Sequence, residues 1–298
     1  MNTPADSHIT TETYLPPAIK AWQFFLTDQG RSHFTVKAFI GDLNLMASFF
    51  PPDITLGAIT TTDINRFLDW LQKERPVPCS PKSFSRRITS IKAFFRWLTQ
   101  SGRLTADPAE KVLQQSVISP LPEVLTKEEE EAVLKAAEKL LHASKSDARP
   151  YTLLLLLLTT GIKKGECLTL STNHLELSDA SAPYLFVRYA NSSNRYKERK
   201  ISLSDAWIES YRVYLSQYKP VEQVFPWSPR RLEYLLEDLG VAAGLKKHLS
   251  FDMCRWTCAL NDWKSGEDKE IIRQKLGISK IQWREIGNKL KQLAANTN

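Results

Sequence analysis

The chain has 298 residues, 42% of them hydrophobic, which is enough apolar material for two compact domains and shows no collagen-like or low-complexity bias. Lysine and arginine number 40 against 33 acidic residues, and the resulting charge of +7 favours a polyanionic partner, although such a balance is also common on solvated surfaces. The longest apolar run, within residues 151–160, is too short to span a membrane, and residues 1–13 lack an apolar signal core, so we expect a cytoplasmic protein with no membrane partner.

Residues 14–110 are predicted to form a helical domain. Within 34–50, apolar residues recur at spacings of three and four, which is the period of a helix with one buried face. Thr61 and Thr62 are placed to cap the next helix, because threonine oxygens accept hydrogen bonds from the first free backbone N–H groups of a helix. A proline-rich turn over 76–81 ends that helix.

The helix that follows carries one narrow apolar stripe, from Phe84 to Leu98, and cations on the opposite side. No acidic residue occurs between Ser80 and Arg103. Solvated helices usually alternate glutamate with lysine, so a cationic face without counter-charges favours contact with phosphates. The cations of this helix that we expect at such contacts are Lys82, Arg86, Lys92 and, at the margin of the face, Arg87.

A stretch containing several prolines and serines, 111–122, is predicted to be a linker, and a second domain is predicted over 123–293. Thr126 and Glu129 form a T-x-x-E capping box at the first helix of this domain. A fully buried helix is expected over 151–159. Strands and further helices are then expected over 184–189 and 200–203, and over 206–218, 229–242, 252–263, 269–276 and 280–293.

The predicted fold class is therefore mainly α, with one small antiparallel β-hairpin in the second domain and flexible ends at 1–13 and 294–298. This order of elements resembles the tyrosine recombinase or phage integrase family. Local words in the family's order support the resemblance over most of the chain: Thr35–Phe39, Ser85–Leu98, Asp107–Ala109, Leu121–Glu129, Leu158–Glu166 and Leu276–Gly277. The resemblance implies an amino-terminal core-binding domain of the SAM-like type, an integrase-type catalytic-like domain, and double-stranded DNA clamped between them.

In that family two arginines hold the scissile phosphate, and a lysine and histidine-type residues manage its protons. The resemblance places Lys163 at the first arginine and Asn194 at the lysine, but lysine lacks the guanidinium fork and asparagine is no useful proton donor. Arg255 matches the second arginine directly, whereas Asp252 occupies a histidine position. Two interpretations of this pair stay open: Asp252 caps the helix and forms a structural salt bridge with Arg255, or Arg255 contacts the DNA backbone.

The nucleophile of the family is a carboxy-terminal tyrosine, and no tyrosine follows Tyr234 in this chain. The resemblance places Gly287, or a close neighbour, at that position. Because a phenol oxygen must attack the phosphate, we expect a DNA-binding protein of recombination or integration with no intact catalytic site. One alternative is an active recombinase whose nucleophile is displaced, as at Tyr234, or supplied in trans. Another is an interaction protein that occupies a recombinase's subunit interface through its carboxy-terminal helix and has little DNA affinity.

The resemblance also implies that cations of the second domain contact the DNA backbone: Lys163, Lys164, Arg195, Lys197, Arg199 and Arg255. No metal or cofactor is expected, because His174 and His248 are isolated from the cysteines and the glycine-rich nucleotide motifs are missing from the sequence. The four cysteines lack C-x-x-C spacing and are predicted to be reduced core residues. Besides double-stranded DNA, a second copy or a related recombinase is a possible partner through the carboxy-terminal helix.

Overall fold

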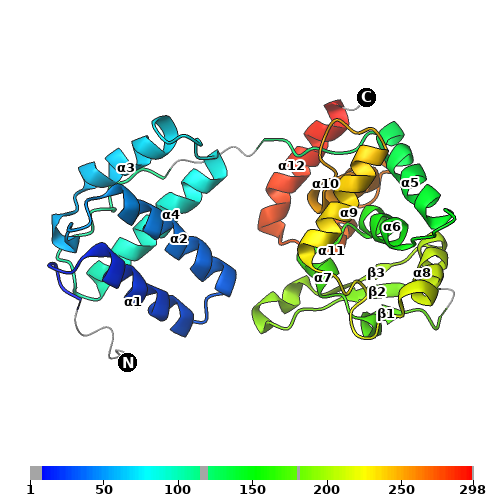
Figure 1. The fold of residues 1–298 in the computed structure, drawn as a ribbon, viewed down its shortest axis with the longest axis horizontal. Coiled ribbons are helices and arrows are strands. Elements are labelled where there is room, and N and C mark those ends of the chain that lie inside the picture. Colours follow the sequence, from blue (N-terminus) through cyan, green and yellow to red (C-terminus); the bar gives the residue numbers. More distant parts are fainter. Residues whose placement is uncertain (1–8, 115–119, 180–181, 297–298) are drawn as a thin grey trace. The chain divides into compact units, whose positions relative to one another are not determined.

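The computed structural model describes residues 9–114, 120–179 and 182–296. The chain divides into two compact units, with the boundary between Pro120 and Leu121, and each unit is described by itself (Figure 1). The middle of the predicted linker and the extreme ends of the predicted flexible termini lie outside the described residues. The fold is mainly α with one small antiparallel sheet, which confirms the predicted fold class.

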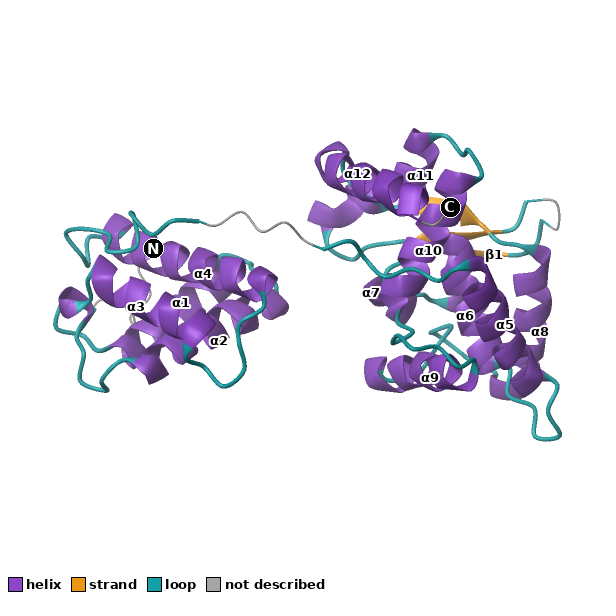
Figure 2. Cartoon of the chain, turned by 90° about the horizontal axis from the view of Figure 1, so that it is seen from above, coloured by secondary structure: helices purple, strands orange, loops and turns teal. Residues whose placement is uncertain are grey.

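Unit 1 is a small group of packed helices (Figure 2). Its core is rich in aromatic side chains. Its elements are α1 (Leu15–Asp28), α2 (His33–Phe49), the short 3-10 turn η2 (Leu56–Ala58), α3 (Thr61–Lys73) and α4 (Pro81–Gln100). Helix α2 packs against both α1 and α4. Trp22, Phe67, Phe94 and Phe95 are almost completely buried, and large aromatic side chains of this kind contribute most of the apolar area that stabilises a small domain. The apolar stripe predicted for α4 therefore faces this core.

The first residue of α3 is capped differently from the sequence prediction. Thr60, rather than Thr61 or Thr62, is the N-cap: Asp63 N–H donates to Thr60 Oγ1 (3.3 Å), and Thr60 N–H donates to Asp63 Oδ2 (3.0 Å). Thr60 is favoured because it alone of the three threonines has a carboxylate three residues later, which completes the reciprocal capping box. The Thr61 hydroxyl instead donates to the carbonyl of Pro108 (2.7 Å).

Unit 2 consists of helices with a small sheet along one side of them (Figure 1). Its helices are α5 (Lys127–Leu141), α6 (Arg149–Thr160), α7 (Lys164–Leu168), α8 (Asp205–Tyr218), α9 (Pro229–Ala242), α10 (Phe251–Lys264), α11 (Lys269–Lys275) and α12 (Lys280–Asn296). Its strands are β1 (Leu175–Glu176), β2 (Tyr184–Val187) and β3 (Arg199–Ser202), which pair antiparallel in that order, and its 3-10 turns are η3 (Thr172–His174) and η4 (Ser192–Lys197). The predicted hairpin is present as β2 and β3, with Leu185 opposite Ile201.

Helix α6 is the buried centre of unit 2 and leads the chain to the candidate site. The side chains of Leu153–Leu158 are all buried, and the helix packs against α5, α8 and α10. Gly161 ends it with φ of 59°, in the left-handed region that favours glycine. A Cβ atom there would lie 3.2 Å from Cys258 Sγ. This tight turn sets the position of Lys163, the N-cap of α7, and of Lys164, its first residue.

Parts of both predicted flexible ends are held by hydrogen bonds. Leu56 N–H donates to the carbonyl of Thr13 (2.9 Å) and Gly57 N–H to that of Thr11 (2.8 Å). Residues 294–296 continue α12. Among the described residues, none of the helices is both long enough and apolar enough to cross a lipid bilayer.

Candidate functional site

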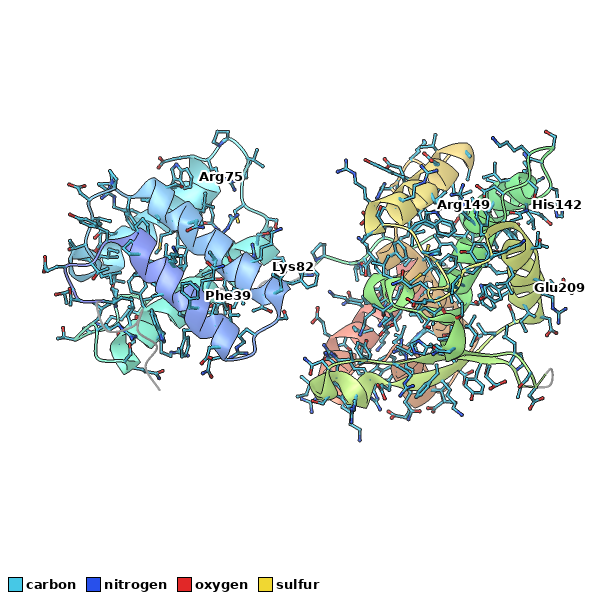
Figure 3. All side chains as sticks on the ribbon, turned by 60° about the horizontal axis from the view of Figure 1, so that its bottom comes forward. Phe39, Arg75, Lys82, His142, Arg149 and Glu209 are labelled. Atoms are coloured by element: carbon cyan, nitrogen blue, oxygen red, sulfur yellow. The ribbon has the colours of Figure 1, made fainter. Side chains whose placement is uncertain are left out.

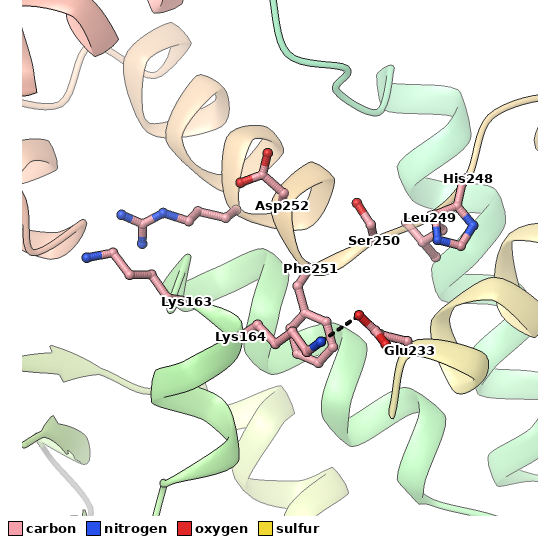
Figure 4. A pocket seen from close by; sticks show the side chains of 9 residues that line it. Lys163, Lys164, Glu233, His248, Leu249, Ser250, Phe251 and Asp252 are labelled. Carbon is pink, nitrogen blue, oxygen red and sulfur yellow. Dashed lines mark hydrogen bonds and ion pairs between the residues drawn. The ribbon is translucent and has the colours of Figure 1, made fainter. Parts of the chain in front are cut away.

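A pocket of about 410 Å³ in unit 2 brings together four of the predicted site residues, Lys163, Lys164, Asp252 and Arg255. Helices α7, α9 and α10 and the segment before α10 supply its walls (Figure 4). We call it the Lys163–Arg255 pocket, and its lining residues are Lys163, Lys164, Glu233, His248, Leu249, Ser250, Phe251, Asp252 and Arg255. Because several of these side chains are cationic, the pocket is suited to an anion.

Arg255 is held by backbone carbonyls, not by Asp252. Its NH1 group donates to the carbonyl of Gly161, and its NH2 group donates to that of Leu276 (2.6 Å). The N-cap of α10 is Ser250, whose hydroxyl oxygen accepts from the backbone N–H of Met253 (3.2 Å). The side chain of Asp252 is exposed. The interpretation of Asp252 as the cap and structural partner of Arg255 was therefore wrong. Ser250 already accepts the hydrogen bond from a free backbone N–H at the start of the helix. Burial lowers the pKa of Arg255.

Lys163, at the start of α7, is half-buried between a carbonyl acceptor and a carboxylate. Its Nζ donates to the carbonyl of Gly277 (3.3 Å) and lies 3.8 Å from Glu166 Oε1. Burial lowers the pKa of Lys163 to about 8; Glu166 opposes this shift, and the charges of Arg255, Arg199 and Lys197 add to it. An ammonium group that loses its proton this readily behaves differently from the guanidinium expected at this position.

Arg199 is buried in unit 2 and does not face solvent as predicted for a DNA contact. Its side chain is 8% exposed, and it forms two bonds to the Glu166 carboxylate, NH2 to Oε2 (2.9 Å) and NH1 to Oε1 (3.1 Å). Tyr189 Oη also donates to Oε1 of Glu166. The buried carboxylate needs a bidentate counter-charge, and Arg199 at the start of β3 provides it. The expected role of Arg199 at the DNA backbone is corrected accordingly.

Three consecutive carbonyl oxygens at the end of α11 hold the three cations of this region. The carbonyl of Lys275 accepts from Arg199 Nε (2.5 Å), that of Leu276 from Arg255, and that of Gly277 from Lys163. The last carbonyls of a helix have no partners within the helix and carry its partial negative charge. They therefore position cations from three separate segments.

Two other predicted positions lie elsewhere. Asn194 is in η4, where its side-chain oxygen accepts from Lys197 Nζ (2.7 Å). Gly287 lies on α12, and a Cβ atom there would meet the ring of Trp283, one turn earlier, at 3.5 Å. Neither Asn194 nor Gly287 is among the described residues that line the Lys163–Arg255 pocket. The sequence missed Tyr189, because no spacing connects it with a glutamate 23 residues away.

The cationic face predicted for α4 has a counter-charge that the sequence of this helix does not show. Asp42 of α2 is buried and ion-paired with Arg86 NH2 (3.0 Å) and Arg87 Nε (3.4 Å). Arg87 also contacts Cys79 Sγ (2.7 Å), and its side chain is 13% exposed. Lys92 donates to the carbonyls of Glu110 (3.0 Å) and Val112 (2.6 Å). The premise of a face free of counter-charges was wrong, and Arg87 and Lys92 stabilise unit 1.

The remaining predicted cations differ in how free they are. Lys82, at the start of α4, is exposed and labelled in Figure 3. Lys164 is paired with Glu233 of α9 at 2.5 Å (Figure 4). Arg195 is exposed in η4, and Lys197 is half-buried. Lys82 and Arg195 are therefore the predicted cations with the most exposed side chains.

Comparisons with known proteins agree with this architecture. Residues 123–286 match the phage integrase family, and residues 19–102 match the N-terminal SAM-like domain of phage integrases. The tyrosine recombinase XerD of Caulobacter vibrioides is 29% identical over 223 residues, 70% of this chain and 70% of that protein. The XerH site-specific recombinase bound to palindromic difH substrate has a similar fold, with TM-score 0.73 and 16% identity over 93% of this chain and 83% of that chain. A lambda integrase dimer bound to a COC' core site gives 0.70 and 17% over 90% and 96%.

Proposed function

Because the chain belongs to the phage integrase family, we propose that it binds double-stranded DNA through the Lys163–Arg255 pocket and does not cleave it. The observation that carries this proposal is the contrast between the pocket and position 287. Lys163 and Arg255 face one pocket, whereas glycine occupies position 287, where the resemblance expects the nucleophile. Phosphate binding needs cations, but strand cleavage of this type needs a phenol oxygen as well.

The pocket retains the capacity to hold a phosphate. A guanidinium has five N–H donors, and Arg255 uses two of its nitrogens on the carbonyls of Gly161 and Leu276, so further donors remain for an anion. Lys163, at the start of α7, adds a second positive charge to the same pocket. Asp252 is exposed and lines the same pocket, and its carboxylate weakens the attraction for a phosphate. These side chains therefore support phosphate binding that the carboxylate of Asp252 weakens. They do not supply a group that would attack the phosphate.

The names of the relatives suggest the process. XerD and XerH are recombinases, and the XerH structure contains its difH substrate. For this chain we propose a role in DNA recombination or integration as a non-cleaving DNA-binding or regulatory partner. Exposed cations outside the pocket, such as Lys82 and Arg195, then contribute sequence-independent contacts with the backbone.

Two measurements test the proposal. Gel-shift titration of the purified chain with duplex DNA at two salt concentrations should show binding that weakens steeply as salt rises, because bound phosphates release counterions. Incubation with a nicked suicide substrate should give no covalent adduct. A phosphotyrosyl adduct formed by the chain alone would contradict the proposal, and the lack of any salt-sensitive binding would contradict its DNA-binding part.

One observation favours a displaced nucleophile as the second candidate. Tyr234 of α9 lines a hollow that shares Glu233 and His248 with the Lys163–Arg255 pocket, and its hydroxyl accepts from Arg230 Nε (2.6 Å). The nicked-substrate assay should therefore include Tyr234→Phe. Loss of an adduct in that variant alone would identify Tyr234 as the nucleophile, and an adduct on an added competent recombinase would identify a nucleophile supplied in trans.

The interface alternative has less support from the packing of α12. Leu290 and Leu293 are buried against a cluster that includes Leu260 of α10 and Ile272 of α11. The carboxy-terminal part of the apolar face of this helix is thus already covered within its own unit, whereas Ile281 near its start is exposed. Burial of this kind is the main driving force for docking a helix. We therefore place the interface function behind DNA binding.

A further inference from the structure

We propose that Asp42 determines sequence specificity in unit 1, because it fixes the guanidinium of Arg86 in an orientation that reads a guanine in the major groove of DNA. The inference rests on the proposed function and assigns base recognition to this unit, whereas the sequence predicted a contact between Arg86 and phosphate. Asp42 itself does not touch DNA in this proposal. It acts through Arg86 and is therefore a positioning residue.

The outward face of α4 has a composition that suits the major groove. Its residues recur at spacings of four and three, which places them on one side of the helix: Lys82, Arg86, Thr89, Ala93, Arg96 and Gln100. All six are exposed or half-buried, and none is acidic. The short side chains of Thr89 and Ala93 lie between the longer ones. Because the major groove admits an α-helix, this face can approach the edges of the bases.

Arg86 is held at one edge of its guanidinium and open at the other. Its NH2 group lies 3.0 Å from Asp42 Oδ1, and 39% of its side chain is exposed, compared with 4% for that of Asp42. A guanidinium has five N–H donors, so donors remain for a ligand after the pairing with Asp42. Guanine offers two acceptors in the major groove, O6 and N7, to which arginine binds in a bidentate manner. The ion pair therefore leaves Arg86 able to make this contact from a fixed position.

Asp42 is a rigid support because its own surroundings hold it. It lies on α2, which packs against α4 (Figure 1). Its Oδ2 accepts from the hydroxyl of Ser90 (2.8 Å), and its Oδ1 lies 3.4 Å from Arg87 Nε. Arg87 is largely buried and already supplies the counter-charge that a buried carboxylate needs. The second pairing, with Arg86, is therefore not required for neutralisation, and it orients a side chain at the surface.

The balance of charge favours a base contact over a phosphate contact. The carboxylate of Asp42 offsets part of the positive charge of Arg86, which weakens the attraction of this side chain for a phosphate. A phosphate contact needs charge, as at the exposed Lys82, whereas base reading needs donors in a fixed direction. Removal of the Asp42 charge should therefore release Arg86 to the DNA backbone. Sequence-independent affinity should then increase, while discrimination between bases is lost.

Selection from a pool of duplexes with a random central segment identifies the bases that the full chain prefers. The wild type should enrich a guanine that Arg86→Lys no longer selects, because an ammonium group cannot form the bidentate contact. Lys82→Ala is the matched control, which should weaken binding to every duplex and keep the preference for guanine. In the selected duplex, 7-deazaguanine at this position removes the N7 acceptor. It should weaken wild-type binding about threefold to tenfold and leave the affinity of Arg86→Lys unchanged.

Asp42→Asn tests the positioning role, because it removes the charge and keeps the size of the side chain. It should abolish the discrimination between guanine and 7-deazaguanine. Its affinity for an unselected duplex should rise about twofold to threefold, and its salt dependence should increase by about one phosphate contact. Equal weakening of binding to selected and unselected duplexes would indicate a structural role alone and overturn the proposal.

Ser90→Ala provides a second variant if Asp42→Asn does not fold. It keeps the carboxylate but removes the hydroxyl that holds Oδ2, so it should reduce the discrimination for guanine about twofold or more. Undiminished discrimination in the folded variant would overturn the role of Asp42.

The same selection separates failure of this inference from failure of the proposed function. The lack of any enriched guanine that depends on Arg86, with salt-sensitive binding intact, would overturn this inference and leave the proposed function in place. Failure of the wild type to bind DNA would remove the proposed function and this inference together.

Discussion

Arg199 and Glu166 form a bidentate ion pair inside unit 2, with NH2–Oε2 and NH1–Oε1 distances of 2.9 and 3.1 Å. The backbone N–H of Lys163 donates to the same carboxylate (2.8 Å), and so does the hydroxyl of Tyr189. Burial disfavours the ionised form of Glu166, but the hydrogen bonds and charge of Arg199 outweigh it and hold the pKa at about 2. The pair fastens strand β3 to helix α7, on which the candidate site is built.

The first prediction concerns this pair. Glu166→Gln should destabilise unit 2 by about 3 to 5 kcal/mol, because Arg199 would be left as a buried cation without a counter-charge. Urea unfolding followed by circular dichroism measures the change. Glu233→Gln, at the exposed pair with Lys164, is the control and should cost no more than about 1 kcal/mol.

Acid should weaken the same contribution in the wild type. The pKa of Glu166 is lower in the folded protein than in the unfolded chain, so its stabilising effect is complete above about pH 4.5 and is lost as the pH falls toward about 2. The stability difference between wild type and Glu166→Gln should therefore shrink across that range. A difference that stays constant from pH 6 to pH 3 would show that the ion pair is not what the substitution removes.

Two glycines of unit 2 give predictions of opposite sign. Gly277 has φ of 57°, and a Cβ atom there would clash with the Arg199 guanidinium, so Gly277→Ala should destabilise unit 2 by about 2 to 4 kcal/mol. Gly287 lies inside α12 with space for a Cβ atom, so Gly287→Ala should stabilise the helix by about 0.5 to 1 kcal/mol. Thermal unfolding measures both. Equal destabilisation by both would mean that the packing around α12 is misassigned.

Local signals in the sequence predicted the elements well. The capping box of Thr126 and Glu129 is present, with Glu129 N–H to Thr126 Oγ1 at 3.2 Å, because its partners are three residues apart and need no tertiary context. The left-handed glycine at 161 ends the buried helix close to its predicted end. Strand β1 was missed because its two residues carry no periodic pattern.

Tertiary pairing of charges was the part that sequence could not supply. No acidic residue lies within the helix that carries Arg86 and Arg87, yet Asp42 reaches them from another helix, 44 and 45 residues away in the sequence. The pairing of Arg199 with Glu166 spans 33 residues. Whether a cation is available to a ligand or used inside the protein depends on such distant partners, which no helical or strand period specifies.

Unit 1 offers a direct contrast between an exposed cation and one that is ion-paired inside the protein. Lys82 is exposed, whereas Arg87 is held by Asp42 and Cys79. Lys82→Ala should leave stability within about 0.5 kcal/mol and reduce the slope of log affinity against log salt by about one. Arg87→Ala should destabilise unit 1, because it removes a partner of the buried carboxylate, and should leave the salt slope unchanged. Parallel unfolding and salt titrations separate the two, and a reversed pattern would show that Arg87 is the DNA contact.

The last prediction uses the lysine at the arginine position. Burial holds the pKa of Lys163 at about 8, below the value of 10.5 for a solvated lysine, so this group is losing its proton as the pH rises through 8. Its contribution to phosphate binding should decline over the same range, by at most about tenfold per pH unit for one proton. Lys163→Arg should bind with little change from pH 7 to pH 9.5, because guanidinium stays charged. Filter-binding at constant ionic strength measures both proteins.

Stability provides the internal control for this experiment. Because the folded pKa of Lys163 lies below the unfolded value, its charge disfavours the folded state below pH 8, and this cost is relieved as the pH rises from about 8 to 10.5. Affinity and the Lys163 contribution to stability therefore change in opposite directions, so weaker binding at high pH cannot be attributed to unfolding caused by this residue. An identical decline in wild type and Lys163→Arg would show that Lys163 does not touch the phosphate in the protonated form.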